Sequence, residues 1–534
     1  MTVASMALVA AATFAFRWLT LPTFHNDHFD HVARAQQVLL GAWPVRDFVD
    51  PGLPLTYLLS AAVQLLVGEP FLAEALLFAT GFAIAAALSY KLAAAVSGSV
   101  LAGVFAVAVQ VLAYPRSYNY PKLLVYAVAV AAGWWAIERL TVRRLAVLGA
   151  STAMAYYFRH DHGLYVGIGT VVLIATHLWP LGWPVVARAL GVYAVFTAAF
   201  VAPHLAYVEW HSSLWAYFEH AREFSSAELG LSPMGLPWFA MQWIPGNSIP
   251  FLFWFFWTLP AACLLMLVRD RARQPQGDHI VPMMAMVIAL AFAVNLGFIR
   301  VPLAVRLPDV VLPHTILGAW LLARLWRAPV GWPARLAMRP LLFGAAVGVA
   351  LAVVTAFDTK EYLASIDLTR GAVSLATRWQ LVTRELRQEP SGFMPNASRP
   401  LVPFLQYVRH CTSPQDRLMY VGYQPEVYIV AGRGFAGGHI IYAGRFHADP
   451  QQQALTVRRL TSERVPFVLV PAGMRSHFRE VFPDVWRYVE SHYRPLATVD
   501  PEGDPVDILI DASRTGPATI DRSTGWPCLE RSMS

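Results

Sequence analysis

Long apolar stretches follow one another along the first two thirds of the chain. A helix needs about 20 mostly apolar residues to cross a bilayer, and most of these stretches approach that length, although 98–113 and 145–158 are shorter. We expect about eleven transmembrane helices, at residues 4–22, 71–93, 98–113, 121–138, 145–158, 164–180, 186–207, 249–268, 279–297, 309–326 and 340–357.

The pattern changes after residue 357. Short runs rich in β-branched and apolar residues, at 417–422, 465–471 and 506–511, alternate with polar stretches of helical character such as 476–493. This alternation is typical of a small α/β domain. We therefore predict two domains, a transmembrane domain over 1–357 and an α/β domain over 358–534.

Basic residues in the short loops predict the direction of each helix. Arginine-rich loops at 139–144, 269–273 and 324–339, together with Lys91, should lie in the cytoplasm, because Lys and Arg are enriched in cytoplasmic loops. The N-terminus is then cytoplasmic and the C-terminal domain extracytoplasmic. The same parity leaves the apolar stretch 51–67 on the outer membrane surface, within one long external loop. The other external segments are 114–120, 159–163, 208–248 and 298–308.

Composition agrees with a membrane protein. The chain of 534 residues is 56% hydrophobic and 14% charged, which excludes an ordinary soluble protein. The net charge of +7 comes from loop arginines and lysines and is no sign of a nucleic-acid partner. Residues 1–22 lack a basic start and a small-residue cleavage site, so we expect an anchor there rather than a signal peptide. Cys411 and Cys528 could pair if the tail is extracytoplasmic.

The external loop 23–70 concentrates acidic residues and histidines. Asp27 and Asp30 lie at the start of a predicted helix, and that helix should end at Gly41. Asp27 would be an ordinary N-cap and Asp30 would complement the helix dipole. Alternatively, a carboxylate facing a lipid-borne substrate takes the proton of an attacking hydroxyl.

Cationic residues at the outer ends of other segments suggest a phosphate site. A departing phosphate needs Lys, Arg or His to stabilise its growing negative charge. The simpler reading is interfacial anchoring for the arginines, since long cationic side chains reach for headgroups, and packing for the histidine. Arg17, inside the first apolar segment, should likewise reach outward to the membrane surface. The candidates for binding a donor phosphate are Lys122, Arg159, Arg300, Arg306 and His314.

One motif carries a family resemblance. Asp27, Ala35, Leu40-Gly41 and Pro44-Val45-Arg46-Asp47 resemble the first external loop of membrane glycosyltransferases of the GT-C fold. The similarity is to the branch that contains protein O-mannosyltransferases and the lipid A aminoarabinose transferase. It covers about residues 20–330, and 214–224 resembles a later external loop of the family. The tail resembles the extracytoplasmic domain of many bacterial members.

The resemblance implies a transferase that uses a polyprenyl-phosphate-linked sugar, with Asp27 as the catalytic base. Two positions depart from the family: His28 stands in place of a Glu, and 118–122 lacks the usual second acid. Asp30 or Asp161 would then take over that acid's task. On the acceptor side we consider Asp47, His220 and Arg222. A divalent metal ion held by His28 and His31 is one alternative, and histidines that only hydrogen-bond at the interface are the other.

The sequence thus predicts an all-α, multi-pass membrane protein with a C-terminal extracytoplasmic α/β domain, located in a bacterial-type inner membrane. The predicted activity is transfer of a hexose or pentose from a polyprenyl-phosphate donor to a hydroxyl of a lipid, glycan or protein. A relative that binds a lipid-linked sugar without catalysis remains an alternative. A transporter fits less well, because charges sit at the ends of the segments and no duplicated halves appear.

Overall fold

The computed structural model describes residues 2–21, 24, 26–231, 233–239, 246–273, 279–328, 332–357, 359–364, 366, 371–500, 504–515, 518–521 and 525–529. Two compact units share these residues. The first unit comprises Met1–Pro22, Ala75–Tyr207 and Leu229–Val382, and the second comprises Thr23–Glu74, Val208–Glu228 and Thr383–Ser534. The second unit therefore combines the tail with two segments from the first half of the chain. Asp358, the predicted domain boundary, lies outside the described residues.

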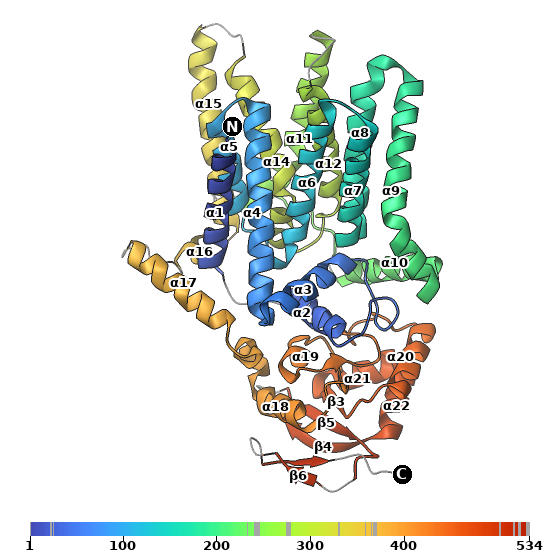
Figure 1. The fold of residues 1–534 in the computed structure, drawn as a ribbon. Helices are drawn as coiled ribbons and strands as arrows, with labels where there is room; N and C mark the ends of the chain where they lie inside the picture. The colour runs from blue at the N-terminus through green and yellow to red at the C-terminus, as the bar shows by residue number, and fades with distance from the viewer. Residues whose placement is uncertain are drawn as a thin grey trace. The chain divides into compact units, whose positions relative to one another are not determined.

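The first unit is a helical bundle (Figure 1). A helix occupies each of the eleven apolar segments predicted from sequence, and among the described residues six helical segments are long and apolar enough to cross a membrane. The number that does cross stays a prediction. The helices are α1 (Val3–Leu19), α4 (Pro70–Ser97, which starts in the second unit), α5 (Val100–Leu112), α6 (Tyr120–Ile137), α7 (Val142–Phe158), α8 (His160–Leu178), α9 (Trp183–His211), α11 (Ser248–Arg273), α12 (Ile280–Leu296), α14 (Val311–Trp326) and α15 (Trp332–Ala356).

Shorter elements connect these helices. They are η1 (Ser117–Asn119), η2 (Trp179–Leu181), α13 (Leu303–Arg306), η3 (Leu307–Val310) and α16 (Thr359–Ala364), and α17 (Ala372–Leu386) follows. In the bundle, α8 packs against both α7 and α12. Small residues allow close approach: a Cβ on Gly149 of α7 would lie 2.9 Å from the backbone nitrogen of Thr197 in α9. Such small-residue contacts are typical of helices packed in a membrane.

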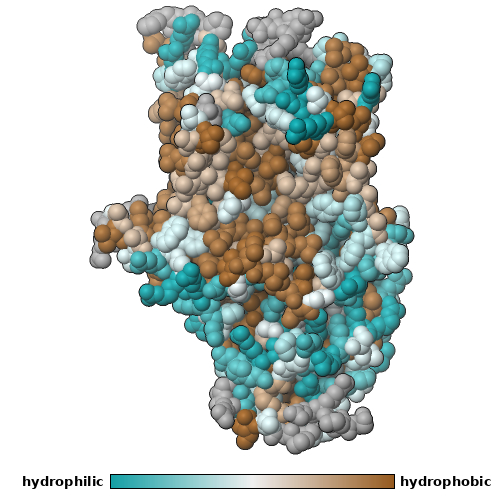
Figure 2. Space-filling model, in the orientation of Figure 1, coloured by the Kyte–Doolittle hydropathy of each residue, from teal (hydrophilic) through white to brown (hydrophobic). Residues whose placement is uncertain are grey.

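Many large apolar side chains of the bundle point outward. Examples are Leu101 at 80% exposed, Leu265 at 74% and Phe343 at 68%. Figure 2 shows hydrophobic side chains over much of the visible surface of these helices. An outward apolar face of this kind is expected of helices that contact lipid tails, since a soluble monomer rarely exposes such patches.

Arg17 does not reach outward, and our prediction for it is wrong. Its side chain is buried, and Nη2 donates a hydrogen bond of 2.8 Å to the carbonyl of Pro115. The guanidinium also lies over the rings of Phe82 and Tyr114, at 4.1 and 4.2 Å from their centroids. A buried arginine is tolerated where aromatic faces and carbonyls replace water, and Arg17 thereby ties α1 to the turn before α6.

The second unit contains a five-stranded mixed sheet in the order β2-β1-β3-β5-β4, and the three strands predicted from sequence are confirmed. β1 is parallel to β2 and β3, whereas β5 is antiparallel to β3 and β4. β6 and β7 form a separate hairpin. The strands are β1 (Arg417–Tyr420), β2 (Gly434–Phe435), β3 (Phe467–Pro471), β4 (Tyr493–Val499), β5 (Val506–Asp511), β6 (Ala518–Ile520) and β7 (Pro527–Leu529).

Helices cover both faces of this sheet. Along β3, Val468 and Val470 pack with Phe478 and Trp486 from two helices, whereas Phe467 points the other way, 5.4 Å from the ring of Phe404. This alternation is expected for a strand buried on both faces. The helices of the second unit are α2 (Asn26–Leu39), α3 (Pro54–Val67), α10 (Leu214–Leu231), η5 (Pro390–Phe393), η6 (Asn396–Leu401), α18 (Val402–Cys411), α19 (Glu426–Ala431), α20 (Pro450–Ser462), α21 (Ala472–Val481) and α22 (Pro483–His492).

The external loop 23–70 is built into the second unit through the edge strand β2. The side-chain amide of Gln37 accepts from the backbone N–H of Phe435 at 3.0 Å and donates to its carbonyl at 3.3 Å. The N–H of Val49 donates to the carbonyl of Gly438 at 3.0 Å. The loop thus satisfies the backbone groups that an edge strand leaves open.

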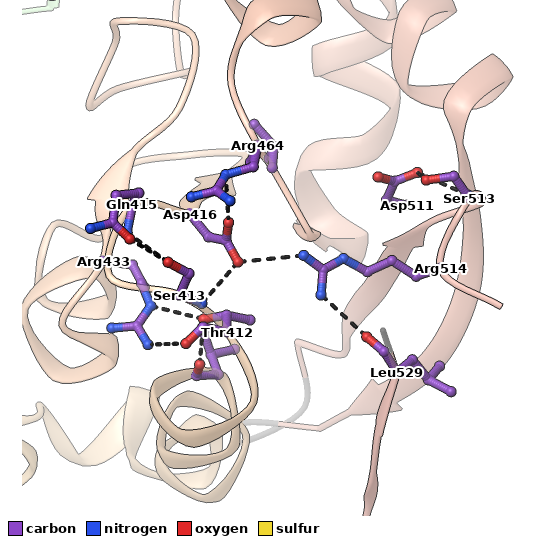
Figure 3. A network of polar contacts seen from close by, with 12 residues as sticks. Thr412, Ser413, Gln415, Asp416, Arg433, Arg464, Asp511, Ser513, Arg514 and Leu529 are labelled. Atoms are coloured by element: carbon purple, nitrogen blue, oxygen red, sulfur yellow. Dashed lines mark hydrogen bonds and ion pairs between the residues drawn. The ribbon is translucent and has the colours of Figure 1, made fainter. Parts of the chain in front are cut away.

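A polar network (Figure 3) and a disulfide connect the last strands to the rest of the second unit. The buried carboxylate of Asp416 pairs with Arg464 at 3.3 Å and Arg514 at 3.4 Å. Arg433 donates to the carbonyls of Arg409 and Thr412 at the end of α18. Nearby in sequence, Cys411 forms a disulfide with Cys528.

Candidate functional site

A small polar cavity lies inside the first unit. Its volume is about 40 Å³, and since a water needs about 10–15 Å³, it has room for a few waters or one small tetrahedral group. Its walls come from α6, α8, the end of α12 and the segment 297–310. The lining residues are Lys122, Tyr126, Arg159, Asp161, His162, Tyr165, Val294, Gly297, Phe298, Arg300, Arg306, Asp309 and Val310.

Lys122 enters the cavity from the first turn of α6. Its ammonium lies 2.5 Å from Oδ2 of Asp309, which belongs to η3. Both side chains are largely buried, at 14% and 6% exposed. Pro121 lies in the first turn of α6, where its missing N–H costs nothing, so the local sequence starts the helix at the point that sends Lys122 inward.

Arg159 and Asp161 form a second ion pair in the cavity. Arg159 has an extended backbone between α7 and α8, and its Nε lies 3.0 Å from Oδ1 of Asp161 in the first turn of α8. Arg300 and Arg306 complete the lining cations. Four cationic side chains face two carboxylates, an excess of two positive charges. Such a cavity favours an anion, and the burial of Lys122 and Asp309 strengthens their charge interactions.

The structure therefore brings together four of the five residues predicted to bind a donor phosphate. His314 is elsewhere. It is buried in α14, with Nδ1 at 2.7 Å from the carbonyl of Val310 and Nε2 at 2.9 Å from that of Phe256. Both ring nitrogens thus face backbone carbonyls rather than a ligand, which agrees with the packing alternative.

In the second unit, Asp27 and Asp30 have different surroundings. Asp27 lies in the first turn of α2 and not before it, because the helix begins one residue earlier, at Asn26. The N-cap prediction is therefore wrong. Its carboxylate is partly exposed, and no hydrogen bond or ion pair joins it to another residue in the described parts of the chain. Asp30 instead binds Arg34 through both oxygens, at 3.1 and 2.9 Å.

Two later aspartates of the loop, Asp47 and Asp50, form hydrogen bonds with other side chains of the second unit. Asp47 accepts from Arg46 at 2.6 Å, and although partial burial opposes it, this hydrogen bond lowers the pKa of Asp47. Asp50 is buried and accepts from the hydroxyls of Tyr57 and Tyr217, the latter at 2.8 Å. Asp50 therefore joins α3 to α10.

The predicted metal ligands do not form a metal centre. His28 is buried with Nδ1 3.6 Å from the carboxylate of Glu74, and Ser60 donates to the same carboxylate at 2.7 Å. Burial is the main cause that lowers the pKa of His31. Within the described ranges, no group of three or more His, Cys, Asp or Glu side chains is arranged to hold a metal ion. His28 and His31 therefore belong to no such group in the part of the chain that the structure describes, and no step below uses a metal ion.

The residues predicted on the acceptor side separate into a packed and an exposed group. The ring of His220 in α10 stacks on that of His447, with centroids 4.7 Å apart, and His447 stacks on His439 at 4.2 Å. Four residues further along α10, Phe224 packs on Phe446 at 4.9 Å. Arg222 is exposed and lies 3.7 Å from Glu219. We call His220, His439 and His447 the histidine stack.

Comparisons of the sequence with protein-family models and with curated proteins give no match. Among solved structures, the chain is similar to ArnT from Cupriavidus metallidurans bound to undecaprenyl phosphate, with a TM-score of 0.51 and 14% identity over 96% of this chain and 99% of that chain. The apo state of that ArnT has a TM-score of 0.51 and 13% identity, over 96% of this chain and 99% of that chain. The chain is also similar to the oligosaccharyltransferase AglB from Archaeoglobus fulgidus, in complex with an inhibitory peptide and a dolichol-phosphate. That comparison has a TM-score of 0.48 and 12% identity, over 96% of this chain and 74% of that chain.

The chain has the GT-C fold. The fold predicted from the motif at Asp27 is confirmed, and with the six long apolar helices it makes this chain a multi-pass membrane protein. At this level of identity the likeness concerns the fold, and the chemistry has to be argued from the site.

Two buried carboxylates of this GT-C chain, Asp309 and Glu74, were not predicted from the sequence. Asp309 lies within "LPDVVLPH", which we read only as the start of an apolar segment. Glu74 lies within α4, in a stretch read as a membrane span. A signal was present in both cases, because an acidic residue inside an apolar stretch is costly and is usually paired or functional.

Proposed function

We propose that this protein transfers a sugar from a polyprenyl-phosphate donor to an acceptor hydroxyl on the extracytoplasmic side of the membrane. The observation that carries the proposal is the cationic cavity of the first unit in a chain of GT-C fold. The ArnT of similar fold is described with undecaprenyl phosphate. A lipid phosphate is therefore the ligand class that we assign to Lys122, Arg159, Arg300 and Arg306.

The charge of the cavity suits the leaving group better than the donor. In the donor, the phosphate is a diester with one negative charge. When the bond between the anomeric carbon and the phosphate oxygen breaks, the charge on the phosphate approaches two. A cavity with an excess of two positive charges stabilises the later state more strongly than the earlier one, and only such a difference speeds the chemical step.

Asp27 is our candidate for the catalytic base. Asp30 is committed to Arg34, whereas Asp27 makes no such pair within the described residues. The carboxylate would take the proton of the acceptor hydroxyl while that oxygen attacks the anomeric carbon. The polyprenyl phosphate departs on the opposite face, so the configuration at the anomeric carbon inverts.

The disulfide supports an extracytoplasmic position for the second unit. Disulfides persist in oxidising compartments and are rare in the cytosol, and Cys411 and Cys528 both belong to this unit. Asp27 lies in the same unit. Lipid-borne donors are the usual source of activated sugar on that side, since nucleotide sugars are cytoplasmic. An inner membrane facing a periplasm would meet these requirements.

The test is transfer by the purified protein in detergent. Undecaprenyl-phosphate-linked hexoses and pentoses serve as donors, and lipid, glycan and peptide hydroxyls as acceptors. We expect one donor to be consumed by the wild type and not by Asp27→Asn, with Asp30→Asn as the matched carboxylate control. Equal transfer by wild type and Asp27→Asn would exclude Asp27 as the base. Donor binding without transfer to any acceptor would favour the non-catalytic alternative.

A further inference from the structure

Asp309 has no role in the reaction proposed above, although it is buried and lines the cavity. It is 4% exposed, and it lines the cavity. Its Oδ2 holds the ammonium of Lys122. Its Oδ1 is buried, and among the residues that the structure describes none gives it a hydrogen bond. A buried carboxylate oxygen without a donor is costly, by about 1–3 kcal/mol or more, so the cavity calls for a hydrogen-bond donor at this position.

The other groups of the cavity make Asp309 unusual. The second lining carboxylate, Asp161, already faces the guanidinium of Arg159. The hydroxyl of Tyr126 is engaged with Nδ1 of His162 at 2.9 Å. Oδ1 of Asp161 likewise has no hydrogen bond among the described residues, but it lies 3.0 Å from Nε of Arg159, and its side chain is 34% exposed against 6% for Asp309. Asp309 is therefore the lining carboxylate at which a missing hydrogen bond costs more. Because that ligand is proposed to be anionic at its phosphate, the part of it suited to donate to Oδ1 is a neutral hydroxyl of the same molecule.

We infer that Asp309 is the specificity-determining carboxylate that accepts a hydrogen bond from the sugar hydroxyl next to the phosphate. This inference rests on the proposed function. Lys122 joins the two sites, since its ammonium is within hydrogen-bond distance of Asp309 and is assigned to the phosphate. On the sugar, the hydroxyl nearest to the phosphate is the one at C2, one bond from the anomeric carbon. The structure thus assigns a donor class: sugars with a free C2 hydroxyl, as opposed to 2-deoxy sugars.

The experiment compares three lipid donors by their dissociation constants in detergent. Undecaprenyl-phosphate-linked glucose and mannose differ in the direction of the C2 hydroxyl, and both become the same compound when that hydroxyl is removed. We expect wild type to bind one of the two about tenfold more tightly than the 2-deoxy compound, since hydrogen bonds to charged groups discriminate strongly. Asp309→Asn should reduce that ratio severalfold, whereas Asp161→Asn should leave the ratio unchanged.

Two results would overturn the inference. One is a wild type that binds the 2-deoxy compound as tightly as the better of the two sugars, a result that needs no variant to fold. The other is an unchanged ratio in Asp309→Asn. Undecaprenyl phosphate without a sugar is the reference ligand. If it fails to bind the wild type, the proposed phosphate site fails; if it binds and only the ratio is insensitive to Asp309, this inference alone fails.

Discussion

Lys122 and Asp309, 187 residues apart in the chain, form an ion pair of 2.5 Å inside the helical bundle. Such a pair is more informative about function than about stability. Desolvation of the two charges offsets most of their attraction, yet loss of either partner leaves the other charge buried and unpaired. The pair therefore predicts a pattern of stability that differs between single and double variants.

We expect Lys122→Met to destabilise the bundle by about 3–5 kcal/mol, because the carboxyl group of Asp309 is then left buried without its partner. The double variant Lys122→Met, Asp309→Leu should recover most of that loss. Thermal unfolding in detergent measures both, with Lys91→Met as an exposed control. Equal destabilisation by the single and the double variant would mean that the two residues are not energetically coupled.

Asp27 and Asp30 should respond to the same substitution in opposite ways. Asp30→Asn weakens a salt bridge with Arg34, whose Nη1 also donates to the carbonyl of Val49 at 2.7 Å. We expect it to lower the melting temperature and to retain transfer activity. Asp27→Asn should leave the melting temperature within about 1 °C, because surface changes cost little, and should remove transfer. If both variants lose activity in proportion to stability, Asp27 has no special role.

Reduction of the disulfide should destabilise the second unit. The bond between Cys411 and Cys528 closes a loop of 117 residues in sequence separation, and removal of a native disulfide typically costs about 2–5 kcal/mol. We expect a lower melting temperature for the double variant Cys411→Ser, Cys528→Ser than for wild type. Reductant should lower the melting temperature of the wild type in the same way. Cys263→Ala, which removes the buried free thiol, serves as the control and should keep the response to reductant. No effect of reductant on the wild type would contradict the bond.

The histidine stack should make the second unit less stable in acid. Burial, followed by neighbouring positive charges such as Arg459 and Arg34, holds the pKa of His439 and His447 well below the ordinary value. Below about pH 6.5 these histidines bind protons in the unfolded state but not in the folded state. Stability therefore falls as the pH is lowered from 7 to 5. Melting temperatures across this range should slope less in His439→Gln, His447→Gln, and an unchanged slope would exclude the stack as the cause.

Sequence patterns predicted the helices well and selected four cationic residues that lie close together in the structure. Apolar length located each bundle helix, and the rule that anions need cations selected Lys122, Arg159, Arg300 and Arg306, which the fold gathers into one cavity. Their meeting could not be predicted, because it depends on contacts among α6, α8 and the segment 297–310. The partner of Lys122 was missed for the same reason.

Other misses have similar physical causes. The burial of Arg17 depends on the rings of Phe82 and Tyr114, which are 65 or more residues away in the chain. The second unit also depends on long-range contacts, such as that between Gln37 and Phe435. These contacts combine residues 23–74 and 208–228 with the tail in one unit. Local pattern carries no information on such pairings.

The most direct test of the central claim is the affinity of the purified protein for undecaprenyl phosphate and for undecaprenol, which lacks the phosphate. If the cavity binds the leaving phosphate, wild type should prefer the phosphate by about tenfold or more, as expected for charge-assisted contacts. The preference should shrink in Lys122→Gln and in Arg306→Gln. Equal binding of the two lipids by wild type, or a preference that survives both substitutions, would contradict the account.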